Sequence, residues 1–400
     1  MNYSLRQNEA PRADPSTLLR TRARGFPERN TERPLLIRTL QGADFLPRMY
    51  KLSDILTSKK LDAFLIRKRQ NIAYLTGTRG EDSILFFSGG ENRLIANALY
   101  KAEYSGSIKN CRLDIIGNNR IYDYIEKLSR EAHCRRIGFE SGNFAYSQFA
   151  ALKKALRNKK LVPLDGAIES LRMIKDDYEL ECIKDSCETG CKVMNYAAQS
   201  LRPSVSEVWV RDRIEAYMAQ KGIRRADFDI IVASGINASM PHAPASEKKI
   251  RNGEMVVIDL GTMNYGYNSD LTRTVFLGRI DRKSLSIYRV VSDAQEKAIE
   301  KIRPGVQAKY IDSIARQYIS QKGLGKYFIH SLGHGIGMET HEKPRLSINN
   351  SQLLEKNMTI TVEPGVYVPG LGGIRIEDVV LVTEHGHEIL TKGCDYFLCR

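Results

Sequence analysis

Apolar runs of strand length alternate with helix-like stretches along the first part of the chain, from Leu46 to about Leu164. Three segments have the spacing of amphipathic helices, at residues 48–58, 119–132 and 146–157. Alternation of short strands and helices is typical of layered α/β domains, so the pattern predicts such a domain over residues 46–169. The strand-like runs are residues 61–66, 82–88, 93–100, 112–117 and 136–141.

The rest of the chain contains an internal repeat. Residues 201–222 align without gaps to residues 302–323, and each copy begins with an Arg-Pro turn and ends at a glycine, which is a common residue just after a helix. Each copy follows a longer predicted helix and precedes strand-like runs. The repeat predicts one α+β domain over residues 170–400, with two halves related by a pseudo-two-fold axis.

The first half of the repeat places two aspartates on a predicted hairpin. Strand-like residues 255–260 and 270–277 flank a turn-prone Asn-Tyr-Gly. A hairpin centred between residues 264 and 265 would put Asp259 directly opposite Asp270. Like charges in that position destabilise a strand pair. The pair therefore predicts a bound cation, a shared proton or an exposed surface.

The second half offers a matching pair. A hairpin centred on Gly370 would put Glu363 opposite Glu377, with Arg375 on the same face as Glu377. Four carboxylates on two related hairpins repel one another strongly unless cations lie among them.

A histidine among glycines can complete the set. The run 328–342 holds three candidates, His330, His334 and His341, among glycines that let the backbone approach closely. Oxygen-rich ligands with one imidazole favour Mn²⁺, Co²⁺, Fe²⁺ or Zn²⁺ over Mg²⁺. Two such ions would turn a bridging water into a hydroxide nucleophile and polarise a carbonyl.

Composition narrows the class of protein. The net charge of +14 is spread in short basic runs, and no nucleic-acid-reading motif accompanies it, which indicates a basic solvated surface. No run approaches the roughly 18 apolar residues of a membrane span. The seven cysteines are odd in number and unpaired in spacing, which favours a reducing compartment. Residues 1–45 resemble a disordered basic tail without a secretory signal, so we expect a cytoplasmic protein with no membrane or nucleic-acid partner.

The sequence resembles the prolidase/aminopeptidase P branch of the metallopeptidases with the pita-bread fold. The matching strings are VIDLG, YNSDLTRT, HSLGHGIGMETHE, TVEPGVY and GGIRIED. Residues upstream resemble the smaller creatinase-type amino-terminal domain of the same branch. The resemblance implies five metal ligands, with Asp270 and Glu377 bridging the ions. These ligands are Asp259, Asp270, His334, Glu363 and Glu377.

The resemblance also implies roles beyond metal binding. Glu363 would accept the proton of the attacking water, and His242 and His341 would contact the substrate or the tetrahedral intermediate. Arg375 would support the metal carboxylates, and the role of His330 stays open. The implied reaction is hydrolysis of the Xaa-Pro bond at the amino terminus of peptides or dipeptides, through a hydroxide held by two divalent ions, with Mn²⁺ favoured.

Two alternatives remain beside this hypothesis. One is an exopeptidase of the methionine aminopeptidase type, and the other is a non-catalytic peptide-binding protein with the same fold. The resemblance further suggests a homodimer. The sequence does not separate a dipeptidase from an aminopeptidase that accepts longer peptides.

Overall fold

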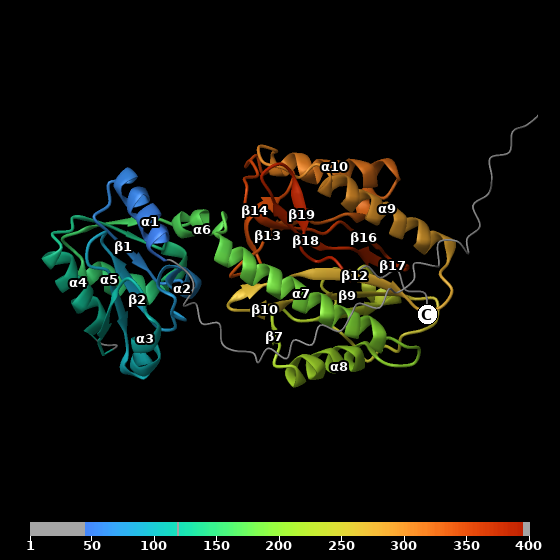
Figure 1. Cartoon of the computed structure of the whole chain (residues 1–400), viewed down its shortest axis with the longest axis horizontal. Coiled ribbons are helices and arrows are strands. Elements are labelled where there is room, and N and C mark those ends of the chain that lie inside the picture. Colours follow the sequence, from blue (N-terminus) through green and yellow to red (C-terminus); the bar gives the residue numbers. More distant parts are fainter. Residues whose placement is uncertain (1–44, 118–119, 395–400) are drawn as a thin grey trace, which may run out of the picture. The chain divides into compact units, whose positions relative to one another are not determined.

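The computed structural model describes residues 45–117 and 120–394 (Figure 1). The predicted basic tail, residues 1–45, lies outside these ranges except for Phe45. None of the helices in the described ranges has the length and apolar character needed to cross a membrane.

The amino-terminal part forms one mixed sheet of six strands in the order β4-β3-β2-β1-β5-β6 (Figure 1). All five predicted strands are present. The edge strand β6 was not predicted, because its sequence KLVP is short and partly exposed. The strands are β1 (Ala63–Ile66), β2 (Ile84–Phe87), β3 (Arg93–Ala96), β4 (Arg112–Ile115), β5 (Arg136–Phe139) and β6 (Lys160–Pro163).

Helices cover both faces of this sheet. On β1, Ala63 and Leu65 point into one apolar cluster, while Phe64 and Ile66 point into another. Because both faces are buried, the central strands are apolar throughout, as in other sheets covered on two sides. The helices are α1 (Leu46–Ser58), α2 (Arg69–Thr76), α3 (Lys101–Ser107), α4 (Ile121–Glu131) and α5 (Tyr146–Ala155), with short 3₁₀ turns η3 (Ala98–Tyr100) and η5 (Ser141–Asn143).

The carboxy-terminal part contains the predicted duplicated helix pairs. After α6 (Ala167–Arg172), the pairs are α7 (Asp177–Ser200) with α8 (Glu207–Gln220), and α9 (Arg282–Ile299) with α10 (Ala308–Gln321). Gly222 and Gly323, just past α8 and α10, have φ of 67° and 76°. Glycine adopts this left-handed conformation without steric cost, which confirms their predicted place at the helix ends.

Two main sheets carry the strands that follow the helix pairs. The first has the order β12-β9-β8, and the second has the order β14-β13-β15-β18-β19. Their strands are β8 (Ile231–Ser234), β9 (Met255–Leu260), β12 (Leu271–Phe276), β13 (Gly333–Gly335), β14 (Glu342–Leu346), β15 (Thr359–Val362), β18 (Asp378–Val382) and β19 (His387–Ile389). The smaller elements are β7 (Arg224–Arg225), η6 (Gly235–Ser239), β10 (Thr262–Asn264), β11 (Tyr267–Asn268), η7 (Gly325–Tyr327), β16 (Gly365–Val368) and β17 (Gly372–Arg375).

The register of the first predicted hairpin is wrong by two residues, because its turn is centred one residue later than predicted. Asn264 pairs with Tyr267, so the turn is centred between Tyr265 and Gly266, whose φ values are 55° and 83°. A two-residue hairpin turn of this kind needs positive φ at both central residues. In this register Asp259 faces Thr272, and Asp270 lies two residues before Thr272, diagonal to Asp259.

The register of the second hairpin is as predicted. Gly365 pairs with Arg375 in the β16–β17 ladder, and Val362 pairs with Asp378 in the β15–β18 ladder. Glu363 and Glu377 lie between these two ladders and oppose one another in the same register, which is centred on Gly370.

Candidate metal centre

The five predicted ligand residues line one cavity of about 830 Å³. Asp259 lies on β9 and Asp270 directly before β12, so the first half of the repeat supplies two carboxylates. His334 lies on β13, and the two glutamates lie at the junctions of the β15–β18 and β16–β17 ladders. Strands from both halves therefore deliver all five side chains to one cavity.

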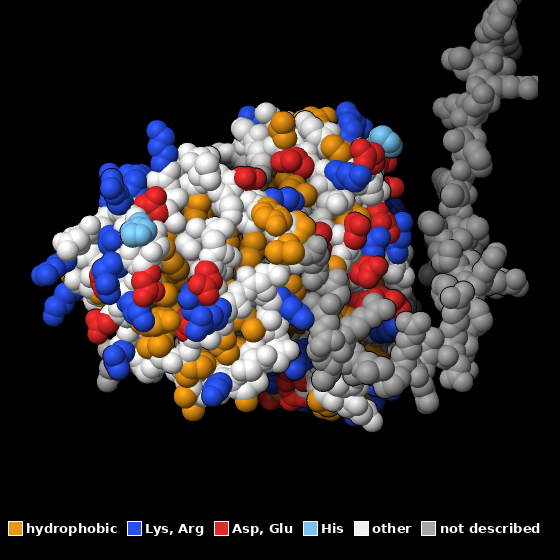
Figure 2. All heavy atoms as spheres, turned by 60° about the vertical axis from the view of Figure 1, so that its left-hand side comes forward, with side chains coloured by type: hydrophobic (Ala, Val, Ile, Leu, Met, Phe, Trp, Pro, Cys, Tyr) orange, Lys and Arg blue, Asp and Glu red, His pale blue; other side chains and the backbone are white. Residues whose placement is uncertain are grey.

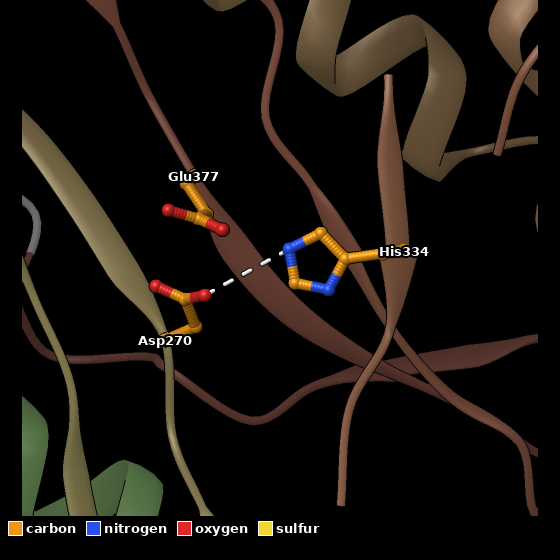
Figure 3. A group of neighbouring side chains, drawn as sticks. All are labelled: Asp270, His334 and Glu377. Atoms are coloured by element: carbon orange, nitrogen blue, oxygen red, sulfur yellow. Dashed lines mark ion pairs between the residues drawn. The ribbon is translucent and has the colours of Figure 1, made fainter. Parts of the chain in front are cut away.

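Three of these side chains form a compact group (Figure 3). One ligand atom from each of Asp270, His334 and Glu377 lies within 4.8 Å of the others, which makes this the one such His, Cys, Asp or Glu triad among residues 45–117 and 120–394. The Nε2 atom of His334 is 3.8 Å from Oδ2 of Asp270 and 3.5 Å from Oε1 of Glu363.

The backbone fixes the tautomer of His334. Its Nδ1 atom lies 3.0 Å from the carbonyl oxygen of Gly335, which can only accept, so Nδ1 must donate. Burial, followed by the nearby His341, lowers the pKa of His334 to about 4. The ring is therefore neutral at pH 7, with the lone pair of Nε2 directed at the carboxylates.

Burial and mutual repulsion disfavour ionisation of the carboxyl groups. Burial, then the charge of Glu377, raises the pKa of Asp270 and of Glu363 well above the ordinary values. Burial, then the charge of Asp259, raises the pKa of Glu377 to about 8. The Oδ1 atom of Asp259 is buried without a hydrogen-bond partner among the described residues. Divalent cations would relieve both features, so this donor set fits them.

A hydrogen-bonded chain surrounds the carboxylates. Arg375 donates from Nη2 to Oδ2 of Asp259 at 2.6 Å and from Nη1 to the hydroxyl of Tyr367 at 2.9 Å. The Nε2 atom of His330 lies 3.0 Å from the same hydroxyl, and its Nδ1 atom must donate to the carbonyl of Ser331. The Tyr367 hydroxyl therefore donates to His330, and the chain fixes the guanidinium that holds Asp259.

The remaining predicted site residues line the same cavity. His341 lies with its ring centre 4.3 Å from that of His334, and His242 lies on the segment between η6 and β9. The sequence did not point to Tyr367 or Arg345, which also line the cavity. A signal for Tyr367 was present, because it lies four residues after Glu363 and so on the same face of the hairpin.

The raised pKa of Glu377 predicts how the stability of the metal-free protein depends on pH. The pKa of Glu377 is about 8 in the folded chain against its ordinary value of 4.5, so its contribution to stability is complete below pH 4.5 and is lost as pH rises through 8. We expect the melting temperature of chelator-treated protein to fall by about 5 °C between pH 5.5 and 8.5. Glu377→Gln should keep only part of this fall, and added Mn²⁺ should reverse it. An equal fall in Glu377→Gln would contradict the assignment.

Two family models match the chain. Metallopeptidase family M24 matches residues 181–384, and the Creatinase/Prolidase N-terminal domain matches residues 48–174. The Xaa-Pro dipeptidase of Pyrococcus furiosus is 38% identical over 346 residues, covering 86% of this chain and 97% of the relative.

Solved structures agree with these matches. An Xaa-Pro dipeptidase from Bacillus anthracis superposes with a TM-score of 0.86 at 33% identity, covering 89% of this chain and 100% of the other. An X-Pro aminopeptidase from Thermotoga maritima superposes with a TM-score of 0.79 at 33% identity, covering 84% of this chain and 97% of the other.

The site combines buried carboxylates with one imidazole on a duplicated α+β fold. Together with these relatives, it defines a metal-dependent peptidase. The chain belongs to metallopeptidase family M24, within the branch that contains the prolidases. The predicted pita-bread fold with a creatinase-type amino-terminal domain is thereby confirmed. The match over residues 48–174 also favours this branch over the methionine aminopeptidase alternative.

Proposed function

We propose that this metallo-exopeptidase hydrolyses the bond before a proline at the second position of its substrate. The supporting observation is the gathering of Asp259, Asp270, His334, Glu363 and Glu377 at one cavity, in a chain that covers 97% of a relative named Xaa-Pro dipeptidase.

The proposed metal ligands are these five residues, with Asp270 and Glu377 shared between two divalent ions. The support is the donor set itself, one neutral imidazole nitrogen and four buried or mostly buried carboxyl groups. Bound ions would supply Lewis acidity for the carbonyl and lower the pKa of water. We propose Mn²⁺ first, with Co²⁺, Zn²⁺ and Fe²⁺ as alternatives.

The proposed roles of the protein groups follow from their places on the cavity wall. Glu363 accepts the proton of the attacking water, from its place on the cavity wall 3.5 Å from Nε2 of His334. His341 and His242 hydrogen-bond the substrate carbonyl as it becomes tetrahedral. Arg375 holds Asp259 in place through the 2.6 Å ion pair.

The charge of the cavity wall favours short substrates. Lys68, Arg172 and Arg375 line the cavity but form ion pairs with carboxylates. Arg345 and Lys343 also line it, and no carboxylate among the described residues pairs with either of them. The Nε atom of Arg345 donates to the Ser331 hydroxyl at 3.1 Å. A free guanidinium suits the carboxylate that a dipeptide ends in.

The test compares substrates of two lengths. We expect cleavage of Leu-Pro to exceed that of Leu-Pro-Gly, with activity lost in chelator and restored by Mn²⁺. No bound transition metal together with no metal-stimulated cleavage of either peptide would overturn the enzyme proposal in favour of a peptide-binding protein.

Replacing Arg345 should separate the two substrates. We expect Arg345→Met to lower kcat/KM for Leu-Pro by about 10- to 100-fold, because a charged hydrogen bond contributes roughly 1.5–3 kcal/mol. The value for Leu-Pro-Gly should change much less. Arg79→Met is the control, since Arg79 is 65% exposed and pairs with Glu103 outside the cavity. An equal loss on both peptides would contradict carboxylate binding by Arg345.

Three further points are part of the proposal. The division into residues 46–169 and 170–400, the homodimer and the cytoplasmic location remain predictions. On the face drawn in Figure 2, the coloured Lys and Arg side chains are interspersed with Asp and Glu side chains. That mixture gives no support on this face to a nucleic-acid partner, which would require a continuous basic surface.

A further inference from the structure

A buried carboxyl group stands apart from the metal centre at the start of α8. Glu207 is 0% exposed, and both of its oxygens accept hydrogen bonds. Oε1 accepts from the backbone N–H and the hydroxyl of Ser234, each at 2.7 Å. Oε2 accepts from the N–H of Ser246 at 3.1 Å, from its hydroxyl at 2.6 Å and from Nδ2 of Asn237 at 3.0 Å.

These contacts close a loop that forms one wall of the cavity. Ser234 and Ser246 are its two ends, and Pro241, His242, Ala243 and Pro244 between them all line the cavity. The middle of the loop is held by a second contact, in which Nη1 of Arg375 donates to the carbonyl of Pro241 at 3.0 Å. The backbone that carries His242 is therefore held between Glu207 and Arg375.

The internal repeat provides a comparison within the same chain. Glu207 aligns with Ala308, and the backbone contacts of the two positions correspond. The N–H groups of Glu207 and Val208 donate to Lys248 and Ser246, and those of Ala308 and Lys309 donate to Gln352 and Asn350. In both halves, therefore, backbone N–H groups at the start of the second helix bind a later segment of the chain. This contact does not require a carboxylate.

The two halves differ in what holds the residues just before this backbone contact. In the second half, β14 (Glu342–Leu346) is held by its ladder with β13. In the first half, residues 240–249 form no strand, so no ladder fixes the segment with His242. The carboxylate occurs in the half that lacks the ladder.

We infer that Glu207 is a positioning residue that sets the place of His242 against the substrate by closing the loop of residues 234–246. The inference rests on the role proposed above for His242. The carboxylate is specifically suited, because backbone N–H groups face both oxygens and each oxygen must accept. A glutamine would present its NH₂ group to one of those donors.

The experiment compares Glu207→Gln with Glu215→Gln. Glu215 is on the same helix but is 44% exposed and pairs with Arg225 at 3.5 Å, so its replacement should leave activity unchanged. We expect Glu207→Gln to lower kcat/KM for Leu-Pro by on the order of 10- to 100-fold, the scale of a small misplacement of a catalytic group, with bound metal per chain unchanged. Amide hydrogen exchange should accelerate within residues 234–246 and not in β9 or β12.

A double-mutant comparison separates positioning from general damage. If Glu207 acts through His242, Glu207→Gln should cost little activity in a His242→Ala background. Equal losses in both backgrounds, unchanged exchange in residues 234–246, or faster exchange throughout the domain would each overturn the inference. Hydrogen exchange is measured without substrate and so does not depend on the proposed function. If the wild-type protein did not cleave Xaa-Pro peptides, the proposed function would be rejected, and the exchange data would still show whether Glu207 holds the loop.

Discussion

Replacement of Asp270 by Asn, or of His334 by Ala, should lower kcat/KM for Xaa-Pro hydrolysis by at least about 10³-fold while the protein stays folded. Both side chains belong to the triad whose ligand atoms lie within 4.8 Å of one another. The first replacement removes a charge that the proposed ions require, and the second removes the one nitrogen donor. Activity, bound metal per chain and melting temperature are measured on the same samples.

The metal-free proteins provide a second readout of the ligand assignment. Asp270→Asn relieves repulsion among buried carboxyl groups, so its metal-free melting temperature should equal or exceed that of wild type. His387→Ala is the control for the histidine, since His387 lies on β19 of the same sheet and does not line the cavity. Near-normal activity and metal content in His334→Ala would refute the ligand assignment.

The two hairpins show how far turn chemistry determines what the sequence can predict. The Gly370 turn gave the correct register. A hairpin centred on this glycine-rich loop is the arrangement that pairs the apolar positions on either side. The Asn-Tyr-Gly turn misled, because Tyr265 is a non-glycine residue at positive φ (55°), which is uncommon, so the centre was placed one residue early. The aspartates are nevertheless neighbours, since a diagonal pair on one strand face remains within reach.

Other parts of the site depend on contacts that no local pattern reports. Glu207 meets Ser234 and Ser246 across 27 and 39 residues, and its own helix gives no sign that it is buried. Arg172 meets Glu342 across 170 residues, between α6 and the strand that follows His341. Spacing predicted the residues that share a hairpin, whereas residues brought together by tertiary packing required coordinates.

A second large effect is expected where the creatinase-type domain meets the catalytic domain. Arg172 is 1% exposed, donates to Oε2 of Glu339 at 2.8 Å and to Oε1 of Glu342, and donates to Oδ1 of Asn71 on α2 at 2.8 Å. Burial opposes ionisation of Glu342, but Lys175 and Arg172 hold its pKa below the ordinary value. Lys68 also pairs with Glu339 at 2.7 Å and Lys175 with Glu342 at 3.2 Å, so Arg172 is the one of these cations that both glutamates share.

Arg172→Met should destabilise the protein by up to about 3–5 kcal/mol, the loss expected when one partner of a buried ion pair is removed, because Lys68 and Lys175 compensate the two glutamates only in part. Urea unfolding measures this loss. Arg69→Met is the matched control: Arg69 pairs with Glu81 at the same 2.8 Å, but the two side chains are 53% and 43% exposed, so the loss should stay below about 1 kcal/mol.

A double variant tests whether the loss of stability comes from uncompensated carboxylate charge. Glu342→Gln removes one of the carboxylates that Arg172 neutralises, so Arg172→Met combined with Glu342→Gln should cost clearly less than the sum of the single variants. Because Glu339 and Glu342 flank His341, Arg172→Met should also lower kcat at saturating Mn²⁺. Additive losses of stability, or a loss below about 1 kcal/mol in Arg172→Met, would show that the guanidinium fills space at this junction without compensating the glutamates.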